Sequence, residues 1–152
     1  MKTEFADCSA PLIRLPDTTS GETEAVLMEA WTIYRVDDFF GLEVPAGTTT
    51  DGASIPRLLW RVCGHPLQAP RVYAALAHDW LYRNAWRLGV TRKEADEIYR
   101  ALLRHFGVGA FKAGVEYYAL RACGGRNYID TPPKEISGGC PERAESLISK
   151  VG

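Results

Sequence analysis

The apolar positions of the chain change their spacing near residue 50, and this change separates two kinds of predicted structure. Residues 25–36 are rich in β-branched and aromatic side chains that partly alternate with polar ones, which predicts a strand. A second, shorter strand is expected at residues 41–44, before Pro45 and Gly47. The first third of the chain therefore predicts an antiparallel hairpin or small sheet.

Between residues 51 and 124 the apolar positions recur every three or four residues, which is the spacing of helices that cover a core. Ser54 is expected to cap the first helix, and Thr91 with Glu94 forms a capping box at the start of the third. The fourth is expected to end at Gly124–Gly125. The pattern predicts helices at residues 55–64, from 70 to a turn at 84–90, at 91–107 and at 110–123.

The predicted elements form one domain of the α+β class. A chain of 152 residues is long enough for one sizeable core. We place the domain at residues 1–125, as a small antiparallel hairpin or sheet followed by a compact helical core, with its chemical motifs in residues 44–125. Residues 126–152 contain Pro132–Pro133 and Gly138–Gly139, which break regular elements. They predict a C-terminal extension that is loosely ordered or docks on a partner.

Composition and charge argue against a nucleic-acid-binding, membrane-spanning or secreted protein. A net charge of −1 gives no general attraction to nucleic acid or to an anionic membrane. No apolar run approaches the roughly 20 residues of a spanning helix, and the N-terminus lacks the apolar segment of a signal peptide. We therefore expect synthesis in a cytoplasm, no transmembrane segment and no nucleic-acid partner. The four cysteines form no C-x-x-C pair and are expected to be free thiols.

A histidine and a carboxylate stand side by side in the second predicted helix. His78 and Asp79 interrupt an apolar run, and Tyr82 shares a helix face with His78. Asp96 follows near the start of the third helix. If these two helices pack antiparallel, Asp96 accepts a hydrogen bond from one imidazole nitrogen and leaves the other as a base. His78 and Asp96 are therefore the candidate catalytic residues.

A polar loop at residues 48–54 provides further candidates. Asp51 in this loop and Asp79 would supply oxygen ligands to a divalent cation, calcium or zinc. Ser54 and Arg57 stand at the start of a predicted helix, where free N–H groups and a guanidinium favour an anion. We therefore predict a metal held by Asp51 and Asp79, and a substrate or anion bound by Ser54, Arg57 and Tyr82.

The same residues also fit a purely structural interpretation. Asp51–Gly52 and Ser54 make an ordinary turn and helix cap. A hydrogen-bonded His–Asp pair also stabilises a unique core without catalysing any reaction. The residue pattern leaves both interpretations open.

Several ordered motifs resemble a known family. They are Thr50–Arg57, Trp60, His78–Tyr82, Arg92–Asp96, and Tyr118–Arg121 with Gly124. Together they resemble domain-of-unknown-function family 1353, found in tailed bacteriophages and prophages, over residues 44–125. The resemblance implies a small phage gene among structural or lysis genes. Its product is expected in the host cytoplasm when synthesised, with the virion as a second location.

The His–Asp helix is also similar to that of phospholipase A2, chiefly in its bacterial and viral members. The similar segments are residues 78–84 and 95–99, and they imply a phospholipase A2-like antiparallel helix pair. The similarity implies that His78 activates water, Asp96 orients His78, and Asp79 binds calcium. The chain departs from that family because it lacks the Gly-rich calcium loop with its flanking cysteines, and the disulfides that join the two helices.

Two functions are consistent with these patterns. The first is a phage accessory protein that is a metal-assisted hydrolase acting on a host envelope component, such as a lipid or a cell-wall ester or amide. The second is a non-enzymatic tail, baseplate or assembly protein in which the His–Asp network is structural. In that case the C-terminal extension would contact other phage structural proteins.

Overall fold

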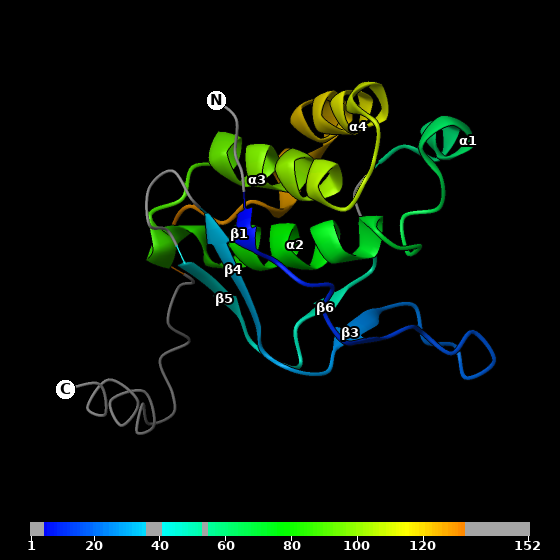
Figure 1. The fold of residues 1–152 in the computed structure, drawn as a ribbon, viewed down its shortest axis with the longest axis horizontal. Coiled ribbons are helices and arrows are strands. Elements are labelled where there is room, and N and C mark those ends of the chain that lie inside the picture. The colour runs from blue at the N-terminus through cyan, green and yellow to red at the C-terminus, as the bar shows by residue number, and fades with distance from the viewer. Residues whose placement is uncertain (1–4, 36–40, 53–54, 133–152) are drawn as a thin grey trace.

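The computed structural model describes residues 5–35, 41–52 and 55–132, and within them it has two small antiparallel sheets beside four α-helices (Figure 1). The α+β prediction is confirmed. Strands come first along the chain and helices second, as the change in apolar spacing indicates. The predicted Ser54 cap and residues 133–152 of the predicted extension lie outside the described residues.

The strands form two sheets of three strands each within the described residues, rather than one hairpin. In the first, the order is β1-β4-β5, and Trp31 lies opposite Val44. In the second, the order is β2-β3-β6. The bounds are β1 Phe5–Asp7, β2 Ile13–Arg14, β3 Ala25–Leu27, β4 Trp31–Arg35, β5 Gly41–Val44 and β6 Thr49–Thr50.

The single strand predicted at residues 25–36 is two strands, because the chain changes sheets at residues 28–30. At the end of β3, Met28 N–H donates to the carbonyl of Leu12, which directly precedes β2 of the second sheet. The chain then bends and enters the first sheet at Trp31. The prediction of one continuous strand is therefore wrong, whereas the strand at residues 41–44 is confirmed.

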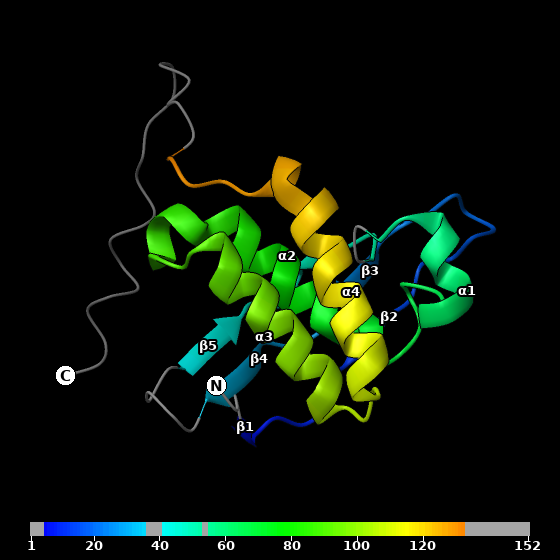
Figure 2. The same ribbon diagram turned by 90° about the horizontal axis from the view of Figure 1, so that it is seen from above.

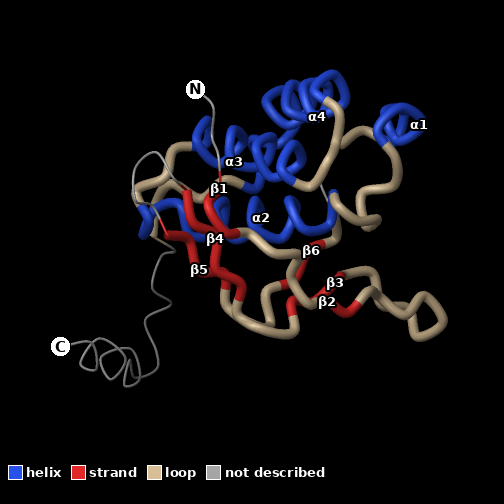
Figure 3. Tube along the Cα trace, viewed as in Figure 1, coloured by secondary structure: helices blue, strands red, loops and turns tan. Residues whose placement is uncertain are grey.

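Helix α2 is the centre of the fold. It lies between strands β5 and β6 on one side and α3 on the other, and α3 in turn packs against α4 (Figures 1 and 2). Coloured by element, α3 and α4 lie on one side of α2 and strands β3, β5 and β6 lie on the other (Figure 3). The bounds are η1 Arg57–Leu59, α1 Trp60–Cys63, α2 Arg71–Leu88, α3 Arg92–His105, α4 Ala110–Cys123 and η2 Gly124–Asn127.

The ends of the helices follow local chemistry. The predicted capping box forms, since Thr91 Oγ1 accepts from Glu94 N–H while Glu94 accepts from Thr91 N–H. Helix α2 continues through most of the predicted 84–90 turn and ends at Leu88. The next residue, Gly89, has a φ of 66°, the left-handed conformation that glycine adopts readily. Helix α4 has the predicted bounds, 110–123.

Residues just after η2 lie against α2. Ile129 N–H donates to the carbonyl of Tyr82 at 3.0 Å, and Tyr128 OH donates to the carbonyl of Val90 at 2.8 Å. Tyr128 and Ile129, which the sequence assigned to the extension, therefore contact α2 and the turn that follows it. Among the described helices, none combines the length and the apolar character that a membrane span needs. Cys63 and Cys123 are free thiols.

Candidate active site

The antiparallel packing of α2 against α3 brings His78 and Asp96 together. The His78 ring nitrogen Nε2 lies 2.8 Å from Asp96 Oδ1, a hydrogen-bond distance. His78 is 3% exposed and Asp96 is fully buried. The contact that the helix spacing predicted is therefore present, and it lies inside the core.

Asp96 is held by three hydrogen-bonding side chains, two from α2 and one from α4. Besides the contact with His78, Tyr82 OH donates to Oδ1 at 2.5 Å and Arg121 Nη1 donates to Oδ2 at 2.9 Å. Arg92 lies further out, with Nε 4.0 Å from Oδ2. Burial raises the pKa of Asp96, but the hydrogen bonds from His78, Tyr82 and Arg121 outweigh it and hold the pKa below its usual value. Asp96 is therefore a fixed carboxylate.

The second ring nitrogen of His78 faces Asp79. Nδ1 lies 3.8 Å from Asp79 Oδ1, too long for a direct hydrogen bond but close enough for strong attraction. Burial lowers the pKa of His78, yet interactions with Asp79 and Asp96 outweigh it and raise the pKa above 6.5. The imidazole therefore lies between two carboxylates, one buried and one near the surface.

The polar loop after β6 fixes the position of Asp79. Thr50 Oγ1 donates to Asp79 Oδ2 at 2.6 Å, and Gly52 N–H donates back to Thr50 Oγ1 at 3.0 Å. Gly52 has a φ of 101°, and a Cβ there would lie 2.7 Å from Cβ of Pro66. The loop thus requires glycine to bring Thr50 onto the carboxylate.

Protonation of His78 is expected to make the stability of the protein depend on pH. Because the folded pKa of His78 is raised above 6.5, its contribution is complete below that pH and is lost as the pH rises through the folded pKa. Denaturation measured from about pH 5 to pH 9 should give a free energy of unfolding that falls by up to about 1.4 kcal/mol per pH unit. His78→Asn should lack this component, and an unchanged slope in that variant would refute the assignment.

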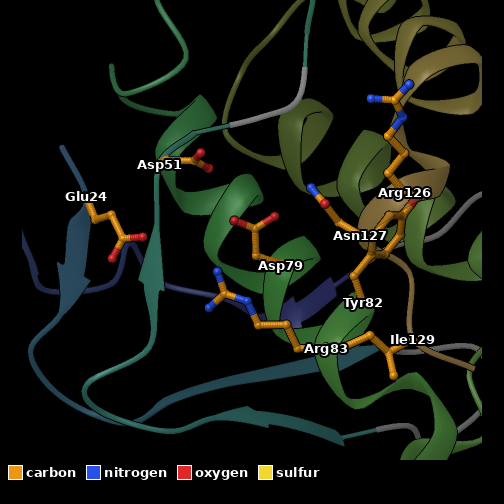
Figure 4. A pocket seen from close by; sticks show the side chains of 8 residues that line it. All are labelled: Glu24, Asp51, Asp79, Tyr82, Arg83, Arg126, Asn127 and Ile129. Atoms are coloured by element: carbon orange, nitrogen blue, oxygen red, sulfur yellow. The ribbon is translucent and has the colours of Figure 1, made fainter. Parts of the chain in front are cut away.

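Asp79 opens onto a pocket of about 390 Å³ (Figure 4). Tyr82 forms part of the wall with its ring, while its hydroxyl donates to the buried Asp96. The pocket therefore reaches the outer edge of the His78–Asp96 network. The lining residues are Glu24, Asp51, Asp79, Tyr82, Arg83, Arg126, Asn127 and Ile129.

The candidate ligands of a cation are only partly assembled. Asp51 and Asp79, which the sequence predicts as metal ligands, line the same pocket. Within the part of the chain that the structure describes, however, no three His, Cys, Asp or Glu side chains are arranged to hold a metal. The guanidinium groups of Arg83 and Arg126 also line this pocket and oppose a cation. These side chains do not fit a dedicated calcium or zinc centre, so the hydrolytic mechanism proposed for this protein does not include a metal ion.

The residues predicted to bind an anion do not all reach the pocket. Arg57 is exposed in η1, with its guanidinium 5.7 Å from the centre of the Trp60 ring, and does not line the pocket. Other cations, Arg83 and Arg126, occupy the pocket instead. Sequence reasoning also did not anticipate Arg121 as a partner of Asp96, although Arg121 belongs to the Tyr118–Arg121 motif.

A second buried polar network lies outside the pocket. Arg71 Nε donates to Glu116 Oε1 at 2.9 Å, and Tyr99 OH donates to Glu116 Oε2 at 2.8 Å. Burial raises the pKa of Glu116 although both partners oppose it. This network joins α2, α3 and α4 and includes none of the pocket-lining residues. It provides an internal comparison for the His78–Asp96 network.

Comparison with known proteins identifies the family. A family model described as "Protein of unknown function (DUF1353)" matches residues 25–120. The chain belongs to the DUF1353 family. The matched segment contains the polar loop and helices α2 and α3, so it holds His78, Asp79 and Asp96.

Two curated relatives from Sinorhizobium fredii (strain NBRC 101917 / NGR234) are similar to this DUF1353 chain. Uncharacterized protein y4jT is 32% identical over 100 residues, which are 64% of this chain and 29% of the relative. Uncharacterized protein y4iH is 32% identical over 119 residues, which are 78% of this chain and 48% of the relative. The chain thus spans less than half the length of either relative. No solved structure matches the chain.

Proposed function

We propose that this DUF1353 protein is a hydrolase in which His78 is the general base. The observation that carries the proposal is the position of the imidazole between two carboxylates with different surroundings. Nε2 is held by buried Asp96 at 2.8 Å, while Nδ1 faces Asp79, which lines the pocket. A carboxylate on one nitrogen fixes the tautomer and orientation of a histidine, and directs the other nitrogen to the reacting group.

The proposed reaction needs only residues of this chain. With Asp96 accepting from Nε2–H, Nδ1 takes a proton from a water molecule as the water oxygen attacks the carbonyl carbon of an ester or amide. Asp79 stabilises the imidazolium that forms, since its Oδ1 lies 3.8 Å from Nδ1. The imidazolium then returns the proton to the leaving oxygen or nitrogen. Arg83, in the pocket wall, supplies positive charge for the oxyanion intermediate.

We propose the substrate class that the sequence suggests, namely an ester or amide of the host envelope. It rests on the DUF1353 membership and on the phage context that the motifs imply. A pocket of about 390 Å³ is large enough for one end of such a polymer or lipid headgroup. A bound divalent cation stays a prediction of the sequence and is not a part of this mechanism.

A structural role is the second candidate, and the burial of the network favours it. His78 is 3% exposed, and no described, fully buried side-chain nitrogen or oxygen lacks a hydrogen-bond partner. A satisfied buried network of this kind stabilises a unique core. On this proposal the protein is a phage tail, baseplate or assembly component, and its partners are other structural proteins.

Hydrolysis of a panel of chromogenic esters and amides tests the enzymatic proposal. The wild type should turn over at least one substrate, with a rate that rises as the pH passes through the raised pKa of His78, because only the neutral imidazole accepts a proton. Asp79→Asn should lose this turnover while remaining folded. Glu116→Gln serves as the control, because it changes a buried carboxylate outside the pocket. Equal losses in the two folded variants would refute the proposed role of Asp79.

A further inference from the structure

The carboxylates of the pocket lie on one side and in the middle of it, whereas cations lie on both sides. In Figure 4 the carboxylates of Glu24 and Asp51 lie on one side, with the guanidinium of Arg83 near them. Arg126 and Asn127 lie on the other side, and Asp79 lies between. The acidic side comes from the segments beside β3 and β6, and the basic side comes from η2. The two sides therefore meet only because the residues after α4 fold back onto α2.

These charges are not neutralised by one another. Among the described residues, no hydrogen bond or ion pair involves the carboxylate of Glu24 or Asp51, or the guanidinium of Arg126. Arg83 donates from Nη1 to the carbonyl of Thr49, which leaves its charge without a carboxylate partner at that contact. Elsewhere in this protein nearby opposite charges do pair, as Arg14 and Glu22 do at 2.6 Å.

Charges arranged in this way select a ligand by the order of its own charges. Carboxylates attract an ammonium group, whereas the planar guanidinium of Arg126 matches a carboxylate or phosphate. A ligand with a single charge would meet one attractive and one repulsive side of the pocket. A ligand with an ammonium at one end and an anion at the other would meet attraction at both ends.

We propose that the pocket binds a small dipolar group, with its ammonium against Glu24 and Asp51 and its carboxylate or phosphate against Arg126 and Asn127. The bond between the two charged ends then lies over Asp79, at the outer edge of the His78 network. A dipeptide has this order of groups, with an amide between an ammonium and a carboxylate. The identity of the cleaved bond rests on the proposed hydrolase, whereas dipolar binding does not.

Some of the residues proposed to bind the ligand lie outside the family match, whereas the His78–Asp96 pair lies inside it. Glu24, Arg126 and Asn127 lie outside the DUF1353 match at residues 25–120, whereas Asp51 and Asp79 lie inside it. The groups that select the anionic end are therefore supplied by a segment beyond the matched region. On this proposal, changing residues 126 and 127 alters the preferred substrate and leaves the His78–Asp96 pair intact.

Calorimetric or NMR titration tests the proposal with four probes. Glycylglycine carries both charges, glycylglycinamide carries only the ammonium, N-acetylglycine carries only the carboxylate, and phosphoethanolamine replaces the carboxylate with phosphate. Each dipolar probe that binds should do so at least about tenfold more tightly than either singly charged probe. The relative affinity of glycylglycine and phosphoethanolamine then identifies the preferred anion. Absence of binding by both dipolar probes, or equal binding of singly charged and dipolar probes, would overturn the proposal.

Matched variants locate the two ends of the ligand. Arg126→Gln should reduce binding of dipolar probes to the level of glycylglycinamide, and Asp51→Asn should reduce it toward that of N-acetylglycine. Arg100→Gln, an exposed arginine on α3 that does not line the pocket, is the control. An equal effect of Arg100→Gln and Arg126→Gln would overturn the assignment. Following cleavage during the wild-type titrations separates the two proposals, since glycylglycine that binds to the wild type but is not cleaved refutes only the hydrolase.

Discussion

Replacing Asp96 with Asn is expected to lower the free energy of unfolding by about 3–5 kcal/mol. The carboxylate is fully buried and accepts from His78, Tyr82 and Arg121. Asn has nearly the same shape but no charge, and its amide nitrogen cannot accept a hydrogen bond. The variant therefore leaves the His78 imidazole with a weaker partner and Arg121 without its carboxylate. Urea denaturation at neutral pH measures the loss.

The neighbouring acid Glu97 provides the control for this prediction. Glu97 lies on the same helix and contacts Lys93 at 3.7 Å, but its side chain is 37% exposed. A surface pair of this kind contributes at most about 1 kcal/mol, so Glu97→Gln should be nearly neutral. A loss for Asp96→Asn no larger than that for Glu97→Gln would contradict the interpretation of Asp96 as the anchor of the network.

The same variant also distinguishes the two proposed functions. If His78 is a base, Asp96→Asn should reduce turnover in the fully folded protein, because the Asn amide favours a different imidazole tautomer. If the network is structural, the wild type has no turnover to lose and stability alone changes. Turnover must therefore be measured well below the midpoint of thermal unfolding of the variant. A variant that is fully folded and as active as the wild type would exclude Asp96 as an orienting residue.

Local sequence signals predicted the helices better than the strands. The start of α3 depends on residues that act within one turn, namely Thr91 with Glu94. Helix α4 ends at Cys123 as predicted, although Gly124 has a right-handed φ of −79° and the chain continues into η2. The division of the predicted strand at residues 28–30 depends instead on Leu12, which pairs with the chain from a distant position. Local alternation of side chains carries no information about which sheet a residue joins.

The candidate site, too, could be predicted only where local sequence signals place its residues. The meeting of His78 and Asp96 could be predicted because both lie on adjacent helices with a short turn between them. Arg121 and Arg126 reach the site only through the packing of α4 and the return of the chain along α2, which the apolar pattern does not specify. Arg57 failed to reach the pocket because its short helix places it over Trp60.

Replacing Glu116 with Gln is expected to cost as much stability as the Asp96 variant, but for a reason unrelated to the pocket. Arg71 is 8% exposed and donates to Glu116, and removing the charge of Glu116 would leave the guanidinium buried without an anion. The expected loss is about 3–5 kcal/mol. Substrate turnover by the folded fraction should remain, since none of these residues lines the pocket. Denaturation and turnover should be measured on the same preparation.

Replacing both charged partners with apolar residues tests whether the stability of this network depends on its charges or only on the volume of its side chains. Removing both partners of a buried ion pair avoids an unpaired charge, so Arg71→Met combined with Glu116→Leu should recover most of the stability lost in Glu116→Gln. Tyr99 also donates to Glu116, so Tyr99→Phe should be added to remove the unpaired hydroxyl. A triple variant that is no more stable than Glu116→Gln would show that this network, too, is required for a purpose other than filling the core.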